Sequence, residues 1–79
     1  MKIRTKRLLR IAAWYGVSLR DLAEMFGLYV ETLKYLLRHN SVLDLNYDQA
    51  ANLIQWFGAA DAIRMMTVEQ MREVAANGY

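Results

Sequence analysis

The chain has 79 residues, a formal net charge of +2, no cysteine and no proline, and 56% of its residues are apolar. This length suits a single domain with a small core, so we expect one domain over residues 1–79. The absence of cysteine excludes disulfide frameworks, thiol nucleophiles and sulfur-bound metals. No apolar run approaches the roughly 20 residues of a membrane span, and none follows the basic N-terminus as in a secretory signal. We therefore expect a soluble cytoplasmic protein with no membrane partner.

The first ten residues are rich in positive charge. They hold five Lys or Arg side chains, which either contact phosphate groups or form a solvated helix start. We expect the first few residues to be an arm or a frayed turn, and a helix to follow as far as Tyr15, with Gly16 ending it. Trp14 and Tyr15 are interpreted as core or interface residues, with stacking on bases as the alternative. The apolar face of this helix would comprise Leu8, Ile11, Ala12 and Tyr15.

Residues 18–27 predict a short helix with a defined start and end. Ser18 can cap its first turn, and Asp21 at the third helical position imitates a capping box. Gly27 stands where a left-handed residue is wanted to end a helix. Arg20 either reaches a phosphate or pairs with Glu24 one turn later. The apolar stripe comprises Leu19, Leu22, Ala23 and Phe26.

Residues 30–40 predict a second helix with two unlike faces. One face is apolar, and the opposite face is aromatic and charged, which is typical of a helix that presents this face to a partner. Glu31 on that face either accepts a hydrogen bond from a base or pairs with Lys34. At the end of the helix, His39 is expected to meet free carbonyls and Asn40 to supply a left-handed stop. The apolar face comprises Val30, Leu33, Leu36 and Leu37, and the other face Glu31, Lys34, Tyr35 and Arg38.

These two helices carry a resemblance to a known family. Small and apolar residues at Leu22-Ala23, Gly27-Leu28, Leu33 and Leu36 resemble the helix-turn-helix of phage repressor and Cro-like (XRE-type) transcription regulators. The resemblance implies a helix-turn-helix over residues 18–38, whose second helix lies in the major groove of DNA. We expect this unit to lie within an all-α fold, a compact bundle of five to six short helices.

The resemblance and the charges together define the expected DNA contacts. Residues 1–40 hold eight basic and three acidic side chains, whereas residues 41–79 hold two basic and five acidic ones. The half that contains the helix-turn-helix is therefore the half suited to a polyanion. The expected base or groove contacts are Tyr29, Val30, Glu31, Lys34, Tyr35 and Arg38, and the expected phosphate contacts are Lys2, Arg4, Lys6, Arg7 and Arg20.

The rest of the chain predicts three more helices and no strand. Residues 41–46 form a connection, after which Asn46 and Gln49 have capping-box spacing. The helix that follows has an apolar face of Ala50, Leu53, Ile54 and Phe57, and Gly58 ends it. A short helix over 59–66 comes next, and a further capping box, Thr67 with Gln70, opens a last helix that Asn77-Gly78 ends.

The C-terminal helices, residues 59–79, are expected to form a dimer surface. A short chain with so many apolar residues cannot hide them all in one small core, and a second copy is the simplest partner. Trp56 is interpreted as an interface anchor or a half-buried core residue. If these helices instead fold back on the first helix, the protein would be a monomer. The expected interface residues are Trp56, Met65, Met66, Val68, Met71 and Val74.

Three functions remain open on this sequence. The leading one is a small repressor that binds a double-stranded DNA operator as a homodimer and is associated with the nucleoid when bound. The second is a protein-interaction module built on the same framework, such as an antirepressor, a phage-encoded inhibitor or an assembly adaptor. The third is a structural homo-oligomer. No acid–base or nucleophile–base pair can be assembled, so we expect no enzyme, no cofactor and no metal site.

Overall fold

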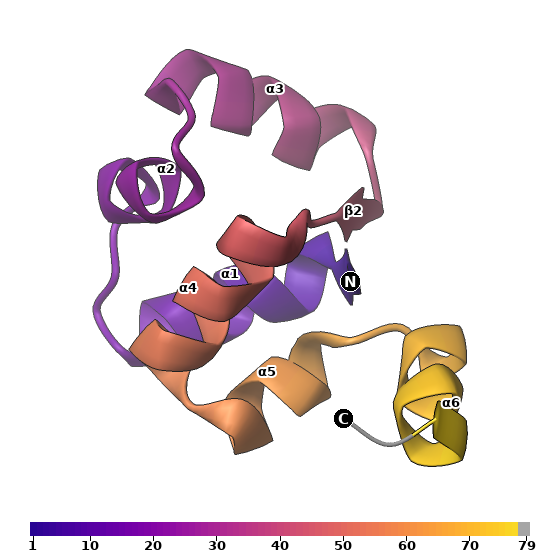
Figure 1. Cartoon of the computed structure of the whole chain (residues 1–79). Helices are drawn as coiled ribbons and strands as arrows, with labels where there is room; N and C mark the ends of the chain where they lie inside the picture. Colours follow the sequence, from indigo (N-terminus) through magenta and orange to yellow (C-terminus); the bar gives the residue numbers. More distant parts are fainter. Residues whose placement is uncertain (78–79) are drawn as a thin grey trace.

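The computed structural model describes residues 1–77 and confirms a small, mostly helical bundle with six helices (Figure 1). No helix among these residues is long and apolar enough to cross a membrane. The predicted end of the last helix at Asn77-Gly78 and the last part of the predicted 59–79 surface involve Gly78 and Tyr79, which lie outside the described residues. The elements are β1 (Lys2–Arg4), α1 (Thr5–Trp14), α2 (Leu19–Phe26), α3 (Val30–His39), β2 (Val42–Asp44), α4 (Tyr47–Phe57), α5 (Ala59–Met65) and α6 (Val68–Asn77).

A short two-stranded sheet joins the start of the chain to the segment after α3. The expectation of no strand was wrong: β1 pairs antiparallel with β2, with Ile3 opposite Leu43 at the centre. The expected N-terminal arm is therefore a strand, and Ile3 is fully buried in the core. Each strand has only three residues, too few to show the alternating pattern that predicts strands.

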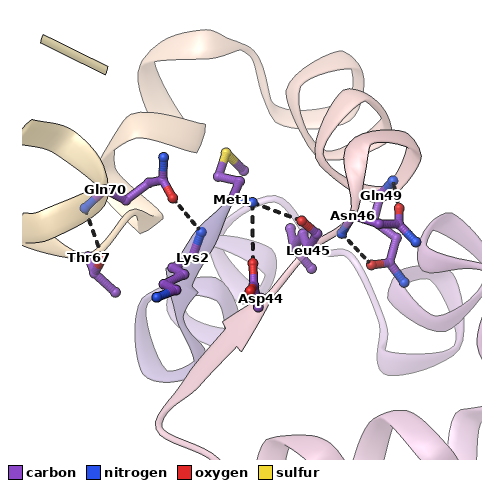
Figure 2. A network of polar contacts seen from close by, with 8 residues as sticks. All are labelled: Met1, Lys2, Asp44, Leu45, Asn46, Gln49, Thr67 and Gln70. Carbon is purple, nitrogen blue, oxygen red and sulfur yellow. Dashed lines mark hydrogen bonds and ion pairs between the residues drawn. The ribbon is translucent and has the colours of Figure 1, made fainter. Parts of the chain in front are cut away.

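The free edge of β1 binds the start of α6. Lys2 donates its backbone N–H to Gln70 Oε1 at 2.9 Å (Figure 2). The carbonyl of Lys2 accepts from the N–H of Thr67 at 3.1 Å. Thr67 Oγ1 accepts from the N–H of Gln70 at 3.1 Å, so half of the predicted capping box is present. The other half is absent because the Gln70 side chain binds β1 instead.

Two other helix starts and one helix end match the prediction. Ser18 Oγ accepts from the N–H of Asp21 at 3.1 Å, and an Asp21 carboxylate oxygen accepts from the N–H of Ser18 at 3.2 Å. Asn46 and Gln49 form the same reciprocal pair at 2.8 and 3.0 Å (Figure 2). Gly27 ends α2 in the left-handed region, with φ 67° and ψ 33°.

The expectation for the end of α3 was wrong. Asn40 has φ −130° and ψ 131°, which is extended backbone rather than a left-handed stop. The chain must enter β2 directly, and an extended residue allows this. Asn40 still closes the helix, because its backbone N–H and its side-chain Nδ2 both donate to the carbonyl of Leu36.

The core lies between α1, α2, α4 and α5, with the apolar face of α3 and the sheet closing it (Figure 1). Met65 and Met66 are 0% and 1% exposed, so their predicted place on a dimer surface was wrong. Met66 also forms a backbone bridge with Ile3, which fixes this segment against β1. The buried cluster comprises Ile3, Leu8, Ala12, Leu22, Ala23, Met25, Phe26, Leu33, Leu43, Leu45, Leu53, Phe57, Ala62 and Met65.

Helix α6 is packed differently from the others. It contributes no buried residue, and Figure 1 shows it at the side of the bundle. Val68 is 51% exposed, while Met71 and Val74 are half-buried. Its observed attachment is to the edge of β1, so its apolar residues are incompletely covered by the rest of residues 1–77.

Candidate nucleic-acid interface

The two helices of the predicted helix-turn-helix are joined by a turn of three residues, 27–29. The N–H of Gly27 donates to the carbonyl of Glu24 at 3.1 Å, and that of Leu28 to the carbonyl of Ala23 at 2.8 Å. These bonds use the free carbonyls at the end of α2, as left-handed glycine caps do. The turn therefore has a fixed geometry, and α3 begins at a defined position relative to α2.

Two side chains from α4 brace the same end of α2. Gln49 Nε2 donates to the carbonyl of Phe26 at 3.1 Å, and Asn52 Nδ2 donates to the carbonyl of Met25 at 2.9 Å. The last carbonyls of a helix have no partner within the helix, so these donors replace water there. Gln49 has two roles, because its Oε1 also caps α4 itself.

The inner face of α3 anchors the helix on the core. Leu33 is 0% exposed, and Val30, Leu36 and Leu37 are half-buried against the core cluster. Val30 therefore belongs to the anchoring face, which corrects its place among the predicted groove contacts.

The outer face of α3 is open to solvent. Tyr29 is 85% exposed and Tyr35 is 63% exposed, and Lys34 and Arg38 are also exposed. Lys34 Nζ lies 3.5 Å from Glu31 Oε1, and the rings of Tyr35 and His39 lie 4.3 Å apart between centroids. An exposed pair such as Glu31–Lys34 is held weakly, so both side chains can turn toward a ligand. The five predicted residues other than Val30 thus share one accessible surface.

The predicted phosphate contacts do not all lie together. Lys2 is exposed on β1 and Arg20 is exposed in the first turn of α2. The other predicted contacts surround a hollow of about 480 Å³, which Arg10, the remaining basic residue of the first ten, also lines. Arg4 also has a buried Nε atom, which has no hydrogen-bond partner within residues 1–77. The lining comprises Arg4, Lys6, Arg7, Arg10, Ser41 and Val42.

A second hollow, of about 700 Å³, adjoins the first through Arg10 and lies beside Trp14. Trp14 is 86% exposed, which rules out its expected core position. Tyr15 is 50% exposed, packs edge-on against Phe57 and donates its hydroxyl to Asp61. This hydrogen bond to Asp61 raises the pKa of Tyr15, and burial and the negative charge of Asp61 act in the same direction.

The hollow beside Trp14 was missed because its residues come from distant parts of the chain. Arg64 Nη1 binds Asp61 Oδ1 at 2.9 Å, so α5 supplies an ion pair opposite the end of α1. The only local signal was Trp14 on the polar side of a helix, four residues after Arg10.

Comparison of the chain with protein-family models, curated proteins and solved structures gives no match. Within residues 1–77, no three His, Asp or Glu side chains are grouped so that they could hold a metal ion. Three exposed features of the described residues bear on function: the outer face of α3, the basic hollow beside α1 and the surface around Trp14.

Proposed function

We propose that the protein is a small transcription regulator that binds double-stranded DNA through the outer face of α3. The observation that carries this proposal is the joint exposure of Lys34, Tyr35 and Arg38 on one face of a helix whose other face is anchored in the core. An α-helix with side chains is about 10–12 Å wide and fits the major groove, which is about 12 Å wide.

The side chains on this face have the chemistry that base reading needs. Arg38 can bind the O6 and N7 atoms of guanine with both arms of its guanidinium, and Lys34 can bind guanine or phosphate. Tyr29, just before the first turn of α3, can donate to a phosphate oxygen. Glu31 can accept from the amino group of cytosine once Lys34 turns to the DNA.

The protein would bind as a homodimer, with two copies of α3 in successive major grooves, about 34 Å apart. Burial of Met65 and Met66 moves the candidate dimer surface to the exposed side of α5 and α6. Ile63 is 43% exposed there and lines an apolar hollow of about 290 Å³ with Ile54, Ala59, Ala62 and Met66. With Ile63, the candidate surface comprises Trp56, Val68, Met71 and Val74.

Repression would follow from occupancy of an operator, which blocks access of polymerase to the DNA. This is the activity that the resemblance to repressors and Cro-like regulators implies, and it would take place on the nucleoid.

Selection of bound duplexes from a random pool at physiological salt tests the proposal. We expect enrichment of a palindrome, and loss of enrichment in the double variant Lys34→Gln, Arg38→Gln with an unchanged thermal midpoint. The control is Arg64→Gln, Arg72→Gln, which removes the same charge from α5 and α6. Once sedimentation shows that this variant still forms the dimer, it should retain the enriched sequence. If the α3 variant enriches the same palindrome as the wild type, the proposal is wrong.

A protein-interaction module is the second candidate, and the two exposed tyrosines favour it. Tyr29 and Tyr35 are 85% and 63% exposed, and tyrosine is enriched at protein interfaces. In that case the duplex selection would give no preferred sequence. A protein partner would instead co-purify after nuclease treatment and be lost in the variant Tyr29→Ala, Tyr35→Ala.

A further inference from the structure

We propose that the hollow between β1, α1 and the start of β2 is a seat for one phosphate group. We call this hollow the phosphate seat; four cations line it, together with Ser41 and Val42. The inference rests on the proposed function only for the source of the phosphate, a strand of the bound DNA. The four cations are Arg4, Lys6, Arg7 and Arg10.

The charge in the phosphate seat is unbalanced. Among residues 1–77, the ion pairs involve the amino group of Met1, Lys34 and Arg64, and none involves a cation of the seat. Like charges held together raise one another's energy, and a bound anion removes this cost. Three of the four cations are arginines, whose planar guanidinium binds phosphate through two parallel N–H bonds.

Arg4 supplies the second observation. Its Nε–H is buried and has no acceptor within the described residues. Buried donors are nearly always paired in folded proteins, so an unpaired one needs an explanation. The Arg4 side chain lines the same hollow, so a turn of its guanidinium would bring this N–H to an oxygen atom of a bound phosphate.

The start of α1 supplies the third observation. Helix α1 has ten residues, no acidic residue in its first turn and no side chain that caps it. Its first turn carries Lys6 and Arg7, which place positive charge at the positive end of the helix dipole. The N–H of Thr5 already donates to the carbonyl of Ser41 at 3.0 Å. An anion in the seat would compensate the two side chains and the remaining N–H groups of this turn.

The hollow has room for the ligand and an open route to it. Its volume is about 480 Å³, whereas one water occupies about 30 Å³ in the liquid, so a phosphate group fits with several waters. Ser41 follows the end of α3 by two residues, so the seat lies next to the segment that leaves α3. A DNA strand beside α3 could place one of its phosphates there.

Titration of ¹⁵N-labelled protein with sodium phosphate, against sodium chloride at equal ionic strength, tests the seat directly. We expect the Nε–H signal of Arg4 to shift and saturate in phosphate and to stay in place in chloride. The variant Arg7→Gln, Arg10→Gln should bind phosphate at least about tenfold more weakly. Both positions are exposed on a helix and glutamine is a good helix former, so the fold should persist.

The matched control removes the same charge from another surface. Lys34→Gln, Arg38→Gln on α3 should leave the phosphate titration unchanged while it abolishes duplex selection. An equal affinity for phosphate in the Arg7, Arg10 variant, or an Arg4 signal that responds equally to chloride, would overturn the seat. Because the two variants separate the readouts, failure of the seat is distinguishable from failure of the DNA-binding proposal.

Two further arms identify the source of the phosphate. If it is a DNA strand, Arg7→Gln, Arg10→Gln should weaken duplex binding and reduce the slope of log K against log salt by about 1 to 2. A strand that continues past Arg10 should also change the fluorescence of Trp14, and the change should be absent in Trp14→Phe. If only free phosphate binds, the Arg4 signal shifts with phosphate, but Arg7→Gln, Arg10→Gln leaves the duplex affinity unchanged and DNA leaves the Trp14 fluorescence unchanged. This outcome supports the seat and assigns it to a small phosphate.

Discussion

Gln70 Oε1 accepts a hydrogen bond of 2.9 Å from the backbone N–H of Lys2, across 68 positions of sequence (Figure 2). The bond joins the first turn of α6 to the free edge of β1. Since α6 buries no residue of its own, this bond and that from Thr67 N–H to the Lys2 carbonyl are important to its position.

Replacement of this acceptor should loosen α6 and leave the rest of the fold intact. We expect Gln70→Ala to cost about 1 kcal/mol, the usual value for one hydrogen bond, and to increase hydrogen exchange at the Lys2 amide. Gln70→Glu keeps an acceptor oxygen and should restore protection of that amide at neutral pH. Equal protection in wild type and Gln70→Ala would show that the bond does not hold α6.

The turn between α2 and α3 should depend on one backbone conformation. Gly27 has φ 67°, and a Cβ added there would meet no atom within 4 Å. Gly27→Ala should therefore act through backbone strain alone and lower the free energy of unfolding by about 1 kcal/mol. Urea denaturation measures this loss. Gly27→Asn is the control and should cost less, because asparagine tolerates the left-handed region; equal losses for both would contradict this explanation.

Substitution of two methionines from the predicted dimer surface should affect different properties of the protein. Met65 is 0% exposed, whereas Met71 is half-buried on α6. We expect Met65→Ala to lower the free energy of unfolding by about 2–5 kcal/mol, through lost burial and a cavity. Met71→Ala should cost much less in the monomer and instead weaken self-association, measured by sedimentation at several concentrations. Similar losses of monomer stability at the two sites would contradict the burial difference.

The Tyr15–Asp61 hydrogen bond should make stability depend on alkaline pH. It raises the pKa of Tyr15 above its ordinary value of 10.0, since the folded protein favours the protonated phenol. Its stabilising effect is thus fully present below pH 10 and is lost as the pH rises through the folded pKa.

We expect Asp61→Ala to return the pKa of Tyr15 toward its ordinary value, as measured by NMR titration of the ring carbons. The stability difference between wild type and variant should narrow above pH 10. A Tyr15 titration that is unchanged in Asp61→Ala would show that Asp61 is not the cause.

Features that depend on neighbouring residues were predictable from the sequence. The capping pair of Ser18 and Asp21, and the left-handed Gly27, each involve a few consecutive residues, whose local chemistry determines the conformation. The spacing of apolar residues by three and four positions likewise predicted which face of α3 is anchored and which is exposed.

Features that depend on contacts between distant segments were not predictable. β1 is a strand because Ile3 lies opposite Leu43 and beside Met66, and nothing within residues 2–4 indicates these partners. The same contacts bury Met66, which the surplus of apolar residues had led us to expect on a dimer surface. The phosphate seat combines Arg4 and Arg10 with Ser41 in the same way, so the sequence indicated its charges but not their convergence.

The way in which α3 is held has a consequence for how the protein could change its target. Leu33 anchors the helix from below, and Gln49 and Asn52 fix the end of the preceding helix from the side. Neither group of contacts involves Lys34, Tyr35 or Arg38. These three positions can therefore be exchanged almost independently of folding, so that new specificity could be acquired on an unchanged scaffold.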